Sequence, residues 1–103
     1  MTNTETDTIT KIEQNLSLKE PPLYKVIFIN DDVTPVDFVV NCLMAIFSHS
    51  IDAAQDLTQK IHQEGFAIVA VLPYEIAEQK GIETTVLSRN NSYPLQIKIE
   101  ADN

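Results

Sequence analysis

The chain has 103 residues and a formal net charge of −8, and 44% of its residues are hydrophobic while 21% are charged. This length allows one domain with a modest core. The negative charge repels phosphate backbones, so we expect no nucleic acid as a partner. A single cysteine, Cys42, excludes an internal disulfide and a cysteine-rich metal site. No apolar run approaches the ~20 residues that span a bilayer, and the start lacks the pattern of a secretory signal. We therefore expect a cytoplasmic protein that does not bind membranes.

The composition changes near Pro21-Pro22, which divide the chain into two parts. Residues 1–21 are rich in Thr, Asn, Glu and Asp, with few apolar side chains. Such a segment cannot bury a core, so we expect a flexible N-terminal tail. Residues 22–103 carry the apolar patterns and are expected to form the folded core domain.

The first expected element of the core is a strand over residues 24–29, which contains a β-branched and aromatic run that favours burial on both faces. Asn30, Asp31 and Asp32 follow it directly and favour a turn, since their side chains bond nearby amides. Thr34 is then expected to cap a helix that begins at Pro35, with Asp37 completing a capping box. Three oxygen-bearing side chains exceed what a turn requires, so we consider this loop a candidate binding site.

Two helices follow in the apolar pattern. The first is expected over residues 35–49, and Val36, Val40 and Met44 widen its apolar face, so it should be mostly enclosed. The second is expected over residues 51–64, from a Ser50 cap to Gly65, which favours a left-handed C-terminal residue.

A third helix lies between two further strands. Residues 66–72 form an apolar run that predicts a strand, and Pro73 opens a helix over residues 74–90 that Gly81 weakens. The final strand alternates from Leu95 to Ile99 and should have one wet face. The order predicts an α+β fold, a compact β-α-α-β-α-β sandwich in which three helices pack on one face of a three-stranded, mainly antiparallel sheet.

The chemistry of enzymes is not evident in this chain. It has no glycine-rich phosphate loop, no nucleophile motif and no paired His or Cys ligands. Thr58 and His62 lie one above the other on the second helix, with Ile61 bordering both. We expect no cofactor, no metal and no catalysis, although a site of Asp31, Asp32 and His62 is the one conceivable metal set.

Several motifs together resemble the ClpS family of adaptors, which hand N-degron substrates to a Clp-type AAA+ unfoldase. The resemblance runs without gaps from about Pro22 to Glu100. The matching residues are Tyr24-Lys25-Val26, Asn30-Asp31-Asp32, Thr34-Pro35, Phe38-Val39, His62 with Gly65, Ile76-Ala77-Glu78 and Pro94-Leu95. The fold of that family, three strands and three helices, agrees with the order expected above.

The resemblance implies a site for a free α-amino group followed by a large apolar side chain, as in peptides that begin with Leu, Phe, Tyr or Trp. The positions that match the amine site are Asn30, Asp31, Asp32 and His62. The positions that match the hydrophobic pocket are Thr34, Val36, Val39, Thr58, Ile61 and Leu95. Val36 and Thr58 depart from the family, which commonly has methionine at both, and a shorter Val36 predicts a wider pocket that admits β-branched first residues more readily.

The resemblance also implies docking on the N-terminal domain of the unfoldase, of the ClpA or the ClpC type. Glu75 and Lys80 match docking positions, although both are otherwise expected to be an exposed helical pair. The alternative function is a protein–protein interaction module resembling the C-terminal domain of the ribosomal stalk protein. That module shares the element order but has no affinity for free N-termini.

Overall fold

A computed structural model describes residues 21–103 of the chain. Three antiparallel strands form one sheet in the order β2-β1-β3, with β1 (Leu23–Ile29) between β2 (Phe66–Pro73) and β3 (Gln96–Ala101). The helices are α2 (Val36–Ala45), α3 (Ile51–Glu64) and α4 (Tyr74–Asn90). The α+β fold and its β-α-α-β-α-β order are therefore confirmed. The expected tail lies outside the described residues, apart from Pro21.

The core lies between the three helices and one face of the sheet. Val26 and Phe28 from β1 and Ala77 from α4 point into this core, and all three are fully buried. The remaining buried members come from the other helices, the residue after α2, β2 and the loop before β3: Val39, Cys42, Leu43, Ile46, Ala54, Ile61, Ala67, Val69 and Leu95. All three helices thus cover the same face of the sheet.

None of the helices in residues 21–103 covers the opposite face of the sheet, yet the central residue of that face is buried. Ile27 is only 6% exposed and pairs with Ile68 on one side and Lys98 on the other. Side chains of paired residues lie on the same face, so these neighbours cover Ile27. The expectation that this strand is buried on both faces is correct for that reason.

The first helix differs from the expected one. It ends at Ala45 rather than His49, because the chain turns away at Ser48, whose φ is 58°. His49 lies beyond the helix, and its Nε2 is 2.7 Å from the carbonyl oxygen of Val69. Thr34 does not cap α2 with its side chain, since Pro35 is the N-cap residue and makes no side-chain hydrogen bond. The expectation that this helix is mostly enclosed was also wrong, because Val36 is 57% exposed.

The second and third helices begin and end where expected. The Ser50 hydroxyl oxygen accepts a hydrogen bond from the Ala53 amide, and Gly65 takes the left-handed conformation at φ 92°. Gly81, which weakens α4 in isolation, lies against β3, and a Cβ there would be 3.3 Å from Cδ1 of Ile99. The missing side chain therefore lets α4 pack closely on the sheet.

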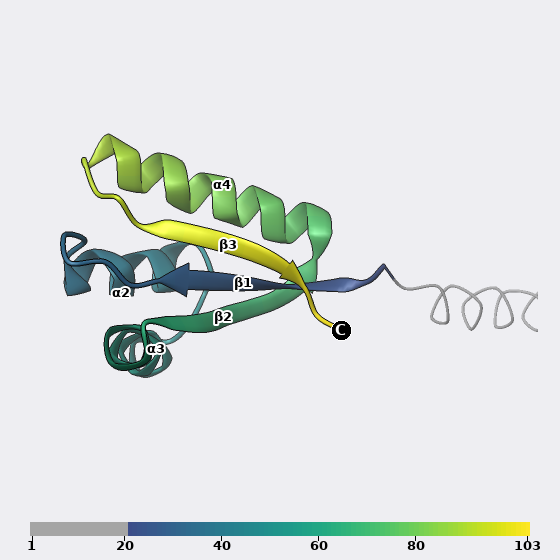
Figure 1. The fold of residues 1–103 in the computed structure, drawn as a ribbon, viewed down its shortest axis with the longest axis horizontal. Helices are drawn as coiled ribbons and strands as arrows, with labels where there is room; N and C mark the ends of the chain where they lie inside the picture. Colours follow the sequence, from purple (N-terminus) through teal and green to yellow (C-terminus); the bar gives the residue numbers. More distant parts are fainter. Residues whose placement is uncertain (1–20) are drawn as a thin grey trace, which may run out of the picture.

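The arrangement brings α2 and α3 to one end of the sheet. The C-terminal end of β1 points to that end, whereas α4 begins at the other (Figure 1). The loop Asn30–Pro35, which the sequence marks as a candidate site, therefore lies where a central strand and two helices meet.

Candidate functional site

The loop after β1 is held together by Asp31. Its Oδ1 accepts hydrogen bonds from the amides of Val33 (2.8 Å) and Thr34 (2.6 Å). Its Oδ2 accepts a hydrogen bond from the Thr34 hydroxyl at 2.8 Å. Aspartate commonly organises a turn in this way, by bonding the amides two or three residues ahead. Thr34 therefore serves the loop rather than the first turn of α2.

The same contacts set the ionisation of Asp31. Partial burial alone would raise the pKa of this carboxyl group. The hydrogen bonds from Thr34 and Val33, together with the nearby charge of Arg89, outweigh burial and lower the pKa below its ordinary value. Asp31 is thus a carboxylate at neutral pH, and both of its oxygens are used within the loop.

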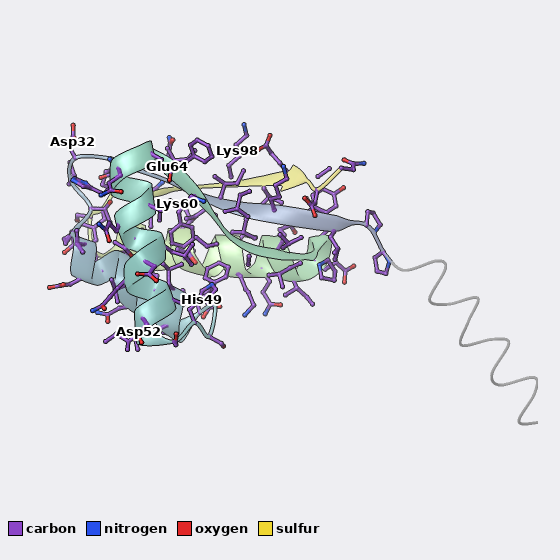
Figure 2. All side chains as sticks on the ribbon, turned by 90° about the horizontal axis from the view of Figure 1, so that it is seen from below. Asp32, His49, Asp52, Lys60, Glu64 and Lys98 are labelled. Carbon is purple, nitrogen blue, oxygen red and sulfur yellow. The ribbon has the colours of Figure 1, made fainter. Side chains whose placement is uncertain are left out.

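A backbone contact fixes the loop against α3. The amide of Asn30 donates to the carbonyl oxygen of Gly65 at 2.8 Å, just after α3 ends. Figure 2 shows Asp32 beside the end of α3 that carries Glu64, with Asp52 at the opposite end of the helix. The acidic loop and the last turns of α3 thus face one another.

A hollow of about 430 Å³ lies between this loop, α2 and α3. It brings together most of the residues that the sequence assigns to a site, and adds Val33 and Pro35. Its lining consists of Asn30, Asp31, Asp32, Val33, Thr34, Pro35, Val36, Val39, Thr58, Ile61 and His62. Val33 and Pro35 were not expected there, although their position in the same loop was a sufficient signal.

The inner part of the hollow is apolar. Val39 is 6% exposed and Ile61 is 3% exposed, so both present buried aliphatic surface. Thr58 is also buried, and its hydroxyl donates to the carbonyl oxygen of Ala54 at 2.7 Å. Because that hydrogen bond satisfies the hydroxyl within α3, the buried Thr58 avoids the cost of an unpaired polar group.

The rim of the hollow is polar and open. Asp32 and His62 are exposed, and Asn30 is partly buried. Within residues 21–103, neither side chain of the exposed pair makes a hydrogen bond or an ion pair. Carboxylate, amide and neutral imidazole groups all offer acceptors, so the rim suits a ligand that carries several N–H donors.

Three expected site residues lie elsewhere. Leu95 does not line the hollow; it is 1% exposed and belongs to the core. Glu75 is exposed in the first turn of α4. Lys80 is partly buried, with Nζ donating to the carbonyl oxygen of Ile46 at 2.7 Å, so the expectation of an exposed helical pair is wrong for this residue.

The described part of the chain lacks two features that mark other classes of protein. Residues 21–103 contain no group of three or more His, Cys, Asp and Glu side chains placed to hold a metal ion. None of the helices in these residues has the length and apolar character needed to cross a membrane.

Comparisons with known proteins agree on one family. The family model for ATP-dependent Clp protease adaptor protein ClpS matches residues 19–98. The chain is 44% identical over 81 residues to the ATP-dependent Clp protease adapter protein ClpS of Treponema denticola, covering 79% of this chain and 80% of that one. It is 41% identical over 93 residues to the protein of the same name from Nautilia profundicola, covering 90% and 96%.

A solved structure shows the same fold. The structure of Agrobacterium tumefaciens ClpS2 bound to L-phenylalaninamide superimposes with a TM-score of 0.78 at 38% identity, covering 81% of this chain and all of that one. Sequence and structure thus point to an adaptor of the Clp protease, which is not itself an enzyme. The chain belongs to the ClpS family of ATP-dependent Clp protease adaptor proteins.

Proposed function

We propose that the hollow binds the free α-amino group and the large hydrophobic first side chain of N-degron substrates. The protein then delivers these substrates to a ClpA- or ClpC-type unfoldase, which works with ClpP. The observation that carries the proposal is that one hollow combines buried aliphatic surface inside it with rim acceptors that have no partner within residues 21–103.

The rim fits an N-terminal ammonium group, which has three N–H donors and no acceptor. Asn30 offers an amide oxygen, Asp32 a carboxylate, and His62 a ring nitrogen when it is neutral. Both oxygens of Asp31 already accept hydrogen bonds within the loop, so its main contributions are negative charge and the shape of the loop. Each well-formed charge-assisted hydrogen bond contributes on the order of 1.5–3 kcal/mol.

The inner surface fits the first side chain. Val39 and Ile61 provide a dry wall, and burial of a Leu or Phe side chain contributes roughly 1.5–3 kcal/mol. After the costs of association, we expect a binding free energy of about −8 kcal/mol, which corresponds to micromolar affinity. Leu, Phe, Tyr and Trp are the expected first residues.

The ligand of a related structure supports this chemistry. L-phenylalaninamide, bound to the Agrobacterium tumefaciens ClpS2, carries a free α-amino group, an aromatic side chain and a carboxamide in place of the next peptide bond. It therefore has the features of a peptide N-terminus. Val36 at the rim is shorter than methionine, which leaves room for β-branched first residues as well.

Delivery requires a second surface away from the hollow. Glu75 lies where α4 begins, at the end of the sheet opposite the hollow, about 20 Å away along β1 (Figure 1). It therefore suits docking on the N-terminal domain of the unfoldase while the hollow holds a substrate. Lys80 joins this surface only in part, because its ammonium group is bound to Ile46.

Fluorescence anisotropy tests the proposal with two peptides that are labelled at their C-termini and begin with Leu. One has a free amino group and the other is N-acetylated. We expect micromolar binding of the free peptide and at least 10-fold weaker binding of the acetylated one. Asp32→Asn should weaken binding of the free peptide about 10-fold, whereas Glu83→Gln, an equivalent change on the exposed side of α4, should not. Equal binding of both peptides would refute amine recognition and favour the stalk-like interaction module.

A further inference from the structure

A second hollow of about 700 Å³ runs between α2 and α3, and we call it the α2–α3 groove. Val36, Val40 and Met44 form its apolar side on α2, and Ile51 faces them from the start of α3. Val36 is 57% exposed, Met44 38% and Ile51 53%. Within the described part of the chain, large apolar side chains thus remain uncovered at both ends of the groove.

The α2–α3 groove is continuous with the proposed amine-binding hollow. Val36, Thr58 and His62 line both. The two cavities therefore meet at the rim, beside the acceptors proposed for the amino group. A peptide whose first side chain fills the hollow has its next residues at this junction.

The length of the groove matches a short extended segment. Val36 and Met44 are eight residues apart on α2, which corresponds to about 12 Å at the rise of an α-helix. An extended chain advances about 3.3 Å per residue, so the groove accommodates three to four residues. His62 lies at the hollow and Ile51 at the far end, since α3 runs back toward the acidic loop.

The side chains of the groove also suit a peptide. Asn41, Gln55 and Gln59 line it, and each carboxamide can donate to and accept from a peptide backbone. Among residues 21–103, Asp37 is the one Asp, Glu, Lys or Arg that lines it, so the groove is suited to neutral or basic segments. The far end, at Met44 and Ile51, is apolar.

We propose that the α2–α3 groove binds the second to fourth residues of the same peptide whose first residue occupies the hollow. It selects a large apolar side chain at the fourth position and disfavours acidic ones. This inference rests on the proposed function, and it extends the recognised signal from one residue to four.

Isothermal titration calorimetry with unlabelled peptides tests it. The first ligand, Leu-Ala-amide, fills the hollow, ends at the junction with the groove and lacks the fourth residue, so it tests the proposed function by itself. The others are five-residue amides, Leu-Ala-Ala-Phe-Ala and Leu-Ala-Ala-Ser-Ala. We expect the Phe peptide to bind about 5–10-fold more tightly than the Ser peptide. The variant Met44→Ala/Ile51→Ala should abolish that preference, and Val86→Ala/Leu87→Ala, which shortens exposed apolar side chains on α4, should retain it.

The outcomes separate the two proposals. Failure of Leu-Ala-amide to bind would overturn the proposed function and the groove with it. Binding of Leu-Ala-amide with equal affinity for the two longer peptides would overturn the groove alone, as would a preference for Phe that survives Met44→Ala/Ile51→Ala. A dimer in sedimentation that this variant dissociates would assign the groove to a second copy of the chain, which also overturns the inference.

Discussion

The two neighbouring aspartates of the loop should have separable roles. Asp31 accepts three hydrogen bonds within the loop, at 2.6–2.8 Å, whereas Asp32 is exposed and makes none within residues 21–103. Asp31→Ala leaves two amides and one hydroxyl without this acceptor. By analogy with the loss of a helix cap, the cost is about 1–2 kcal/mol of unfolding free energy. Asp32→Ala should change stability by less than about 0.5 kcal/mol.

Thermal unfolding followed by circular dichroism measures this difference. For a domain of this size, each kcal/mol lowers Tm by about 4–8 °C. Asp31→Asn keeps one acceptor oxygen and should lie between the wild type and Asp31→Ala. Equal Tm values for Asp31→Ala and Asp32→Ala would refute the assignment of Asp31 as the residue that holds the loop.

The pH dependence follows from the lowered pKa of Asp31. A carboxyl group whose pKa is lower in the folded state stabilises the protein above its ordinary pKa of 3.8, and this contribution is lost as the pH falls through the folded value. The difference in stability between the wild type and Asp31→Asn should therefore be constant from pH 7 to about pH 5 and shrink below the ordinary pKa. Urea unfolding at several pH values tests this, and a difference that grows on acidification would contradict it.

Three further predictions concern single residues. Val36→Met should narrow the hollow and lower the affinity for peptides that begin with Ile or Val about 10-fold relative to a peptide that begins with Leu, as measured by fluorescence anisotropy. Unchanged relative affinities would contradict this prediction. In urea unfolding, Gly81→Ala should change the free energy of unfolding by no more than about 1 kcal/mol, because the higher helix propensity of Ala offsets the 3.3 Å approach of its Cβ to Ile99. Gly81→Val should lower the free energy of unfolding by about 2–3 kcal/mol. The reverse order would refute close packing of α4 on β3 at this residue. Lys80→Met should cost about 1.5 kcal/mol in the same assay because it removes the charged donor to Ile46, and a neutral result would show that this contact contributes nothing.

The sequence predicted most elements because their boundaries are chemically marked. Ser50 and Gly65 delimit α3, and Pro73 separates β2 from α4, so each residue acts locally. The end of α2 lacks such a mark. Ser48 takes a positive φ that non-glycine residues seldom adopt, and nothing in its neighbours indicates this.

The prediction that Thr34 caps α2 was wrong for a related reason. Thr34 stands three residues after Asp31 and three residues before Asp37, so two local motifs compete for it. The sequence favours a capping box as readily as an aspartate turn. In the structure the aspartate turn forms. The hydrogen bond from the Asn30 amide to the Gly65 carbonyl oxygen fixes the start of the loop, and the Thr34 hydroxyl donates to Asp31.

The residue types of the loop after β1 marked it as a candidate site, the resemblance assigned the roles and the pocket positions, and the fold gathers most of these residues. Asn30 and His62 are distant in sequence, and the pairing of β1 with β2 brings their segments together. Leu95 matches a pocket position of the family but is enclosed in the core. Lys80 was expected at the surface. Its contact with Ile46 could not be predicted, because it joins residues far apart in sequence and no local pattern encodes it.

The exposure of the apolar face of α2 was also not predicted from the sequence. Val36 and Met44 widen its apolar face, and a helix with such a wide face is normally enclosed. The adjacent α3 carries few apolar residues, so it covers only part of that face and leaves the α2–α3 groove.

The most direct test of the binding site is a nuclear magnetic resonance titration of the ¹⁵N-labelled protein with Leu-Ala-amide and its N-acetylated form. Binding in the hollow predicts amide shift changes confined to residues 30–36, 39 and 58–62, for the free-amine ligand only. Shift changes centred on α4 or the open face of the sheet, or the same changes with the acetylated ligand, would contradict recognition of an N-terminus by this hollow.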